Sequence, residues 1–118
     1  MPGSHRAVRG PARHERPAID EAALVAARAG DRLVAAARER GIARWIAYLE
    51  PLPDRLRDDE LADLRRTAMR ARAAYGPKDS VRDALPPEVT EPFLEAVDPL
   101  LRTLARRDIT GVHHLGQH

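Results

Sequence analysis

Apolar residues in this 118-residue chain recur mainly at intervals of three and four, the spacing of a helix that is buried along one face. No stretch alternates apolar and polar residues as a half-buried strand does. Alanine and leucine dominate the apolar set, and the only aromatic residues are Trp45, Tyr48, Tyr75 and Phe93. The sequence therefore predicts an all-α fold, a small bundle of four or five short helices.

The composition excludes several classes of protein. Cysteine is absent, so the chain has no disulfide framework, no zinc ribbon and no thiol nucleophile. No apolar run approaches the roughly 20 residues that a transmembrane helix needs, and the N-terminus lacks the apolar stretch of a signal peptide. We therefore expect a cytoplasmic protein that has no membrane partner and no cofactor.

The calculated pI of about 9.6 overstates the basic character of the chain, since 20 basic and 18 acidic residues leave a formal net charge of only +2. The pI is high because every basic residue except Lys78 is an arginine, which stays protonated to very high pH. The basic excess is confined to residues 1–16, which hold few apolar side chains. We expect them to form a disordered basic tail, a feature that aids binding to nucleic acid or to an acidic partner.

The folded domain is predicted over residues 17–108, and its first helix over residues 20–40. Pro17 precedes this helix, and Gly41 follows it where a residue in the left-handed conformation commonly ends a helix. Gly30, inside the helix, is less favourable there than alanine by roughly 1 kcal/mol. It marks a point at which this region could break into two helices.

A second helical segment is predicted over residues 42–50. Its apolar residues share one face and form the densest apolar cluster of the chain: Ile42, Trp45, Ile46 and Leu49. We expect Trp45 to be the centre of the core. Pro51 and Pro53 are expected to end the segment.

A third helix is predicted over residues 54–75, with a short heptad-like row that we call the seam: Leu61, Leu64, Ala68, Ala71 and Tyr75. Small side chains at its middle would let another helix approach closely. We expect the seam to be an interface with a protein partner or a second copy, with a homodimer slightly favoured. In the alternative, the seam is buried within one chain against the second segment and the Phe93 face.

The C-terminal third holds a short segment and one further helical region. Residues 78–85 are expected to be a linker or a short helix capped by Asp79 or Ser80. A helical region follows over residues 88–108, either as two helices or as one helix kinked at Pro99. Residues 109–118 contain two glycines and three histidines, and we expect a flexible tail.

Part of the sequence resembles a DNA-binding helix-turn-helix. Ala37, Gly41 and Ile42 match its first helix and turn. The second helix fits less well, because its expected apolar positions fall on the small Ala47 and the charged Glu50, one residue after Ile46 and Leu49. Its recognition helix would present Arg44 and Tyr48 but no asparagine, glutamine, serine or threonine to read base edges. The residues predicted to contact nucleic acid are Arg6, Arg9, Arg13, Arg44, Arg66 and Arg70.

The remaining chemistry-bearing residues give no defensible site. His113, His114 and His118 include a four-residue spacing that could hold a metal, but no carboxylate lies among them to orient an imidazole. The acidic run at residues 58–60 lies at the expected start of a helix, where acids are favoured electrostatically. We therefore predict no catalytic residue, no metal and no cofactor site.

The preferred hypothesis is a non-enzymatic helical protein-interaction module, an accessory or assembly subunit. An alanine-rich seam in a folded part of this size buries a modest apolar volume, so pairing with another chain would add stability. The alternative is a nucleic-acid-associated helical protein, either a helix-turn-helix regulator or a small subunit of a ribonucleoprotein complex. That alternative depends on the basic tail and the exposed arginines.

Overall fold

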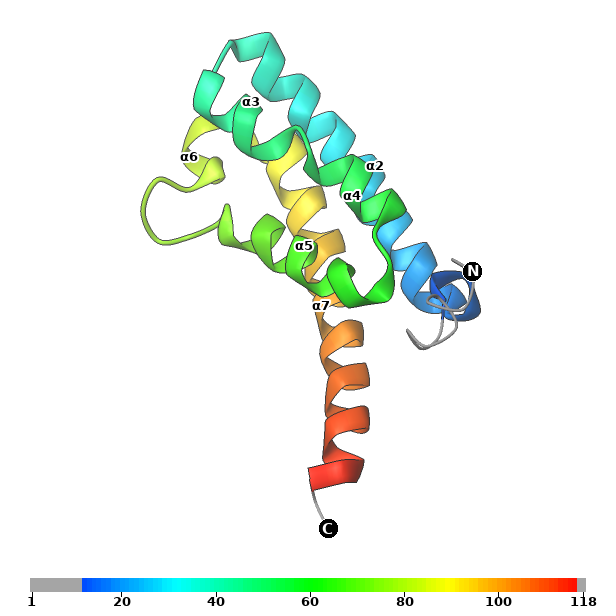
Figure 1. The fold of residues 1–118 in the computed structure, drawn as a ribbon. Coiled ribbons are helices and arrows are strands. Elements are labelled where there is room, and N and C mark those ends of the chain that lie inside the picture. The colour runs from blue at the N-terminus through cyan, green and yellow to red at the C-terminus, as the bar shows by residue number, and fades with distance from the viewer. Residues whose placement is uncertain (1–11, 117–118) are drawn as a thin grey trace.

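The computed structural model describes the backbone of residues 12–116 and the side chains of residues 12–105. Within these limits all regular structure is helical, which confirms the prediction of a small all-α bundle. Two long helices, α2 (Pro17–Arg40) and α7 (Pro87–Gly116), pack against each other (Figure 1). The shorter elements are η1 (Arg13–Glu15), α3 (Ala43–Leu49), α4 (Leu52–Asp58), α5 (Leu61–Ala73) and α6 (Val81–Ala84).

Helix α2 continues through Gly30 without a break, so the predicted break there is wrong. A Cβ atom at Gly30 would lie 3.0 Å from Cε1 of Phe93 on α7 and 3.3 Å from Cγ of Pro53 on α4. The glycine therefore lets two helices approach α2 closely, and this packing offsets its poor helix propensity. As predicted, α2 ends at Gly41, which has a φ of 64° and donates its N–H to the Arg38 carbonyl.

The single third helix predicted over residues 54–75 is wrong, because the chain there forms two helices. Asp59 and Glu60 are extended between α4 and α5. The Thr67 hydroxyl donates to the Asp59 carboxylate, and Arg13 donates to the Asp59 carbonyl, so tertiary contacts fix the break. Pro51 precedes α4 and Pro53 lies in its first turn, where a missing N–H leaves no helix hydrogen bond unmade.

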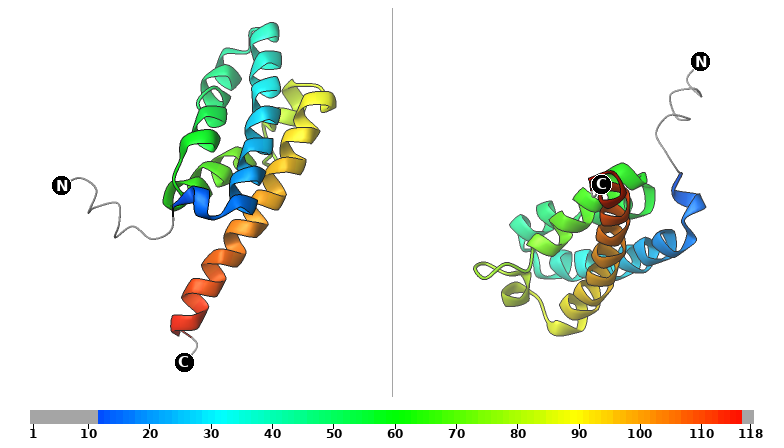
Figure 2. Two further views of the ribbon diagram at one scale, coloured as in Figure 1. Left: turned by 90° about the vertical axis from the view of Figure 1, so that its right-hand side faces the viewer. Right: turned by 90° about the horizontal axis from the view of Figure 1, so that it is seen from below.

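The short helices α3 and α4 follow each other back along α2, while α7 lies along another side of α2 (Figure 2). Helix α5 packs against α7 and α4. The largest fully buried side chain is Phe93, which is 1% exposed and lies at the Gly30 contact. Trp45 is buried, but Ile46 beside it is only partly covered. Trp45 therefore belongs to the core, as predicted, while Phe93 is its largest fully buried side chain.

The seam is buried within one chain. Leu64, Ala68 and Ala71 are inaccessible, Tyr75 is nearly so, and Leu61 is partly covered. Since α5 packs against α7 and α4, the small seam residues serve close packing inside the bundle. The prediction of the seam as an interface is therefore wrong. The alternative, burial within one chain, is found for the Phe93-bearing helix α7, but α4 takes the place expected for the second segment. Any self-association has to use another surface.

Residues 12–16 belong to the folded body, although the predicted basic tail included them. Arg13 is only 7% exposed; its Nε lies 2.7 Å from Oδ1 of Asp20, and its Nη1 donates to the Asp59 carbonyl at 2.8 Å. This side chain joins η1, the first turns of α2 and the connection between α4 and α5. The boundary predicted between residues 16 and 17 is therefore wrong, while residues 1–11 lie outside the described part.

Helix α7 is continuous through Pro92 and Pro99, so the two-helix alternative is not observed. It passes the predicted end at Asp108, and its last turns extend clear of the other helices (Figures 1 and 2). Ahead of it, the Ser80 hydroxyl accepts a hydrogen bond from the Arg82 N–H, which confirms the predicted cap of α6.

Candidate functional site

The six arginines predicted to contact nucleic acid fall into three groups. Arg13 is buried, and so it is a structural residue rather than a contact. Arg6 and Arg9 lie outside the described residues. Arg44 on α3 and both Arg66 and Arg70 on α5 are exposed, and the structure brings these two helices together at one surface.

Tyr48 on α3 joins the two helices through Arg70. Its hydroxyl donates to the Arg70 carbonyl at 2.7 Å, and the Arg70 guanidinium carbon lies 4.3 Å from the centre of its ring. The Ala74 N–H, which a longer helix would direct to that carbonyl, bonds to the Ala71 carbonyl instead. Tyr48 thereby caps a carbonyl in the last turn of α5, and its ring holds the Arg70 side chain in place.

The aromatic contact extends along α3. Trp45 meets Tyr48 edge to face at 5.6 Å between ring centres, and the Arg44 guanidinium carbon lies 4.8 Å from the Trp45 ring. Arg44 also lies 4.0 Å from Asp79, which belongs to the loop between α5 and α6. Two aromatic rings thus connect two exposed guanidinium groups.

Helix α5 adds a second row to this surface. Arg66 lies one turn before Arg70 and 3.5 Å from Asp63 of the same helix. Met69, which lies three residues after Arg66 and so near it on the helix surface, is 50% exposed. We call the set of Arg44, Tyr48, Arg66, Met69 and Arg70 the α3–α5 surface.

The three arginines of this surface were predictable from the sequence, whereas their connection and their apolar neighbour were not predicted. Met69 follows the seam residue Ala68 and falls on the charged side of the helix. An apolar residue on a charged helix face was the sequence signal that could have identified it. The Tyr48 contact had no sequence signal, because it joins helices that are separated by α4.

The positive charge of this surface is local. Acidic side chains slightly outnumber basic ones over residues 17–105. The pairs of Arg44 with Asp79 and of Arg66 with Asp63 are largely exposed, and such pairs are worth between about 0 and 1 kcal/mol. Both arginines therefore remain available to a partner that offers better placed anions.

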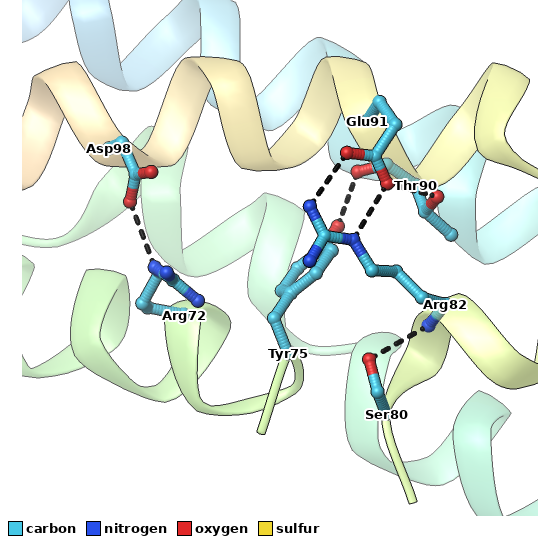
Figure 3. A network of polar contacts seen from close by, with 7 residues as sticks. All are labelled: Arg72, Tyr75, Ser80, Arg82, Thr90, Glu91 and Asp98. Atoms are coloured by element: carbon cyan, nitrogen blue, oxygen red, sulfur yellow. Dashed lines mark hydrogen bonds and ion pairs between the residues drawn. The ribbon is translucent and has the colours of Figure 1, made fainter. Parts of the chain in front are cut away.

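A second polar network lies between α5, α6 and α7 (Figure 3). The buried Tyr75 hydroxyl donates to the Thr90 carbonyl at 2.6 Å, and burial raises the pKa of this phenol. Arg82 bonds both carboxylate oxygens of Glu91, at 2.9 and 2.8 Å. These bonds, followed by one from the Thr90 hydroxyl, lower the pKa of Glu91 to about 2. Arg72 adds an ion pair to Asp98 at 3.0 Å.

This network is structural rather than catalytic. Each of its charged groups already has an opposite charge as partner, and the phenol is buried and bonded. The network fastens the end of α5 and the start of α6 to α7.

A groove of about 500 Å³ lies between α2 and the start of α4. Its charged residues pair with arginines, Glu50 with Arg38 and Asp31 with Arg57. Because each of these two carboxylates is already paired with an arginine, they do not form an acid–base pair for catalysis. The lining residues are Asp31, Val34, Ala35, Arg38, Glu50, Pro53 and Asp54.

The helix-turn-helix resemblance does not extend to the geometry of α3. In that motif the second helix crosses the first at roughly 90–120° and projects toward DNA. Here α3 has seven residues, buries Trp45 and Leu49, and continues into α4 along α2 (Figure 2).

Among the described residues, no metal-ligating group and no membrane-spanning helix adds a further candidate site, and no similar protein indicates one. In the described part of the chain, no group of three or more metal-ligating side chains is suitably placed, and His113, His114 and His118 lie outside the described side chains. No helix among the described residues has the length and apolar character needed to cross a bilayer. No family model, curated protein or solved structure matches the chain.

Proposed function

We propose that the protein is a non-enzymatic helical interaction module that binds a protein partner through the α3–α5 surface. The observation that carries this proposal is Arg70, stacked on Tyr48 beside the half-exposed Met69. Arginine, tyrosine and methionine are enriched at protein interfaces, and arginine and tyrosine are common among the residues that dominate binding energy.

The surface is also ordered before any partner arrives. The hydrogen bond and ring contact between Tyr48 and Arg70 restrict both side chains. Ordering an exposed side chain on binding costs about 0.5–1.5 kcal/mol, and part of that loss has already occurred in the free protein. A partner therefore meets an anchor that is held by two helices.

Nucleic acid is the alternative partner, and three observations disfavour it. Arg13 is buried, acidic residues slightly outnumber basic ones over residues 17–105, and Arg70 covers a face of the Tyr48 ring. Single strands bind proteins by stacking bases on free aromatic faces and by following a continuous positive groove. Among the described residues, Arg70 already covers one face of the Tyr48 ring, and carboxylates beside Arg44 and Arg66 interrupt the positive charge.

Photo-crosslinking from Met69 tests the proposal. A photoreactive amino acid replaces Met69 in one variant and Val25 of α2 in another; Val25 is 43% exposed and so is a matched control. In cells that naturally express the chain, we expect a discrete protein adduct from position 69 that Arg70→Ala diminishes. Equal adducts from both positions would overturn the proposal, and a nucleic-acid adduct would replace it with the alternative.

A further inference from the structure

The charges around the α3–α5 surface indicate what kind of partner it fits. Arg44 and Arg66 each have a carboxylate nearby, from Asp79 at 4.0 Å and Asp63 at 3.5 Å. Arg70 contacts the Tyr48 ring, and no carboxylate of the described residues lies within ion-pair distance of it. The surface therefore contains two weakly paired cations and one cation with no acidic partner in the described part.

Asp63 and Asp79 occupy the places that a partner's carboxylates would take. Asp79 has a φ of 53°, a left-handed conformation that aspartate and asparagine tolerate better than most residues. Its carboxylate is largely exposed, as is that of Asp63. Both acids are thus weak internal competitors for an incoming anion.

The spacing of the α5 residues adds an apolar requirement. Arg66 and Arg70 are one helical turn apart, and the exposed Met69 lies three residues after Arg66, at the edge of the helix face that carries the two arginines. We infer that the α3–α5 surface recognises an acidic peptide segment in which carboxylates flank an apolar side chain that covers Met69. This inference rests on the proposed function and names the chemistry of its partner.

Separate carboxylates fit this surface better than a chain of phosphates. Asp63 and Asp79 lie beside Arg66 and Arg44 and would repel those phosphates of a continuous polyanion that pass next to them. A peptide can place its carboxylates at the arginines and leave other positions neutral.

Fluorescence polarisation with the full chain provides the test. The probe is a labelled peptide of glutamates around a central leucine; its counterparts are the same peptide with glutamines and a single-stranded oligonucleotide of equal charge. We expect the glutamate peptide alone to bind appreciably at low salt. Arg66→Ala and Arg70→Ala should each weaken binding by about two- to fivefold, and Arg28→Ala on α2 should not.

Removal of the internal competitors makes the test specific. The double variant Asp63→Asn and Asp79→Asn should bind the glutamate peptide about two- to fivefold more tightly, because the arginines lose their own carboxylates. The matched control, Glu88→Gln with Glu95→Gln on α7, changes the net charge equally but should have a smaller effect. Thermal melts establish that each variant is folded.

Three results would overturn the inference. These are an equal gain in both double variants, an equal loss with Arg28→Ala, and tighter binding of the oligonucleotide than of the peptide. If position 69 crosslinks to a protein while the glutamate peptide does not bind, the proposed function stands and the acidic partner is wrong. If neither occurs, both proposals fail.

Discussion

The molecule contains the same arginine–tyrosine arrangement twice. We call the arrangement closed where a carboxylate pairs with the arginine, and open where no described carboxylate does. In each, a tyrosine hydroxyl donates to a backbone carbonyl while an arginine lies over the ring: Tyr75 with Arg82, and Tyr48 with Arg70. Glu91 binds Arg82 at the buried Tyr75 (Figure 3). At the partly exposed Tyr48, no described carboxylate pairs with Arg70. Both arrangements fasten helices to each other, but only the open one leaves an exposed arginine without a carboxylate among the described residues.

The largest expected difference between the two arrangements is in stability. Tyr75→Ala removes a buried ring and should lower the free energy of unfolding by about 3–5 kcal/mol. Tyr48→Ala should have less than half that effect, because the ring is partly exposed. Urea unfolding followed by circular dichroism measures both values, and equal losses would contradict the distinction.

A milder pair of substitutions isolates the two hydroxyl groups. Tyr75→Phe leaves the buried Thr90 carbonyl without this donor and should destabilise the protein by about 1–2 kcal/mol. Tyr48→Phe should cost about 0.5 kcal/mol, since water can reach the Arg70 carbonyl once the hydroxyl is gone. The same unfolding assay applies, and a larger loss from Tyr48→Phe would reverse the comparison.

The closed arrangement also predicts a pH dependence. The pKa of Glu91 falls from an ordinary 4.5 to about 2 in the folded chain, first through its bonds from Arg82. Because the folded-state pKa is the lower one, this contribution to stability is complete above pH 4.5 and is lost as the pH falls toward 2. Glu91→Gln should flatten the stability profile in that window, as thermal melts at a series of pH values can show. An unchanged profile would mean that Arg82 does not hold the Glu91 carboxylate in the folded chain.

The smallest expected effect on stability comes from the open arrangement. Arg70→Ala removes an exposed cation–ring contact and should cost about 0.5 kcal/mol or less. Arg82→Ala should cost more, because it also frees Glu91 from a two-point pair. Differential scanning fluorimetry of both variants tests this order. If the α3–α5 surface is a binding site, Arg70→Ala will have a larger effect on partner binding than Arg82→Ala.

The sequence predicted those elements whose signals are local. Apolar spacing placed the helices, Gly41 marked the end of α2, and Ser80 marked the start of α6. The errors occur where distant segments decide the outcome. Phe93 and Pro53 explain Gly30, while Arg13 and Thr67 fix the extended residues between α4 and α5.

The candidate site follows the same division. Arg44, Arg66 and Arg70 were identifiable because exposed cations on helices can be read from a helical projection. Their assembly was not, since it requires Tyr48 to reach across from α3 to the end of α5. Met69 was overlooked because a single apolar residue on a polar face has no periodic partner.

At Gly30 the helices α2, α4 and α7 pack so closely that no space remains for a side chain. A Cβ there would crowd Phe93 and Pro53 at once, so a change in the size of either neighbour alters the room available to the other two residues. Free energies of substitution at these three positions will therefore not add, although the residues are far apart in sequence. The early and late parts of the chain are energetically coupled through the absence of one methyl group.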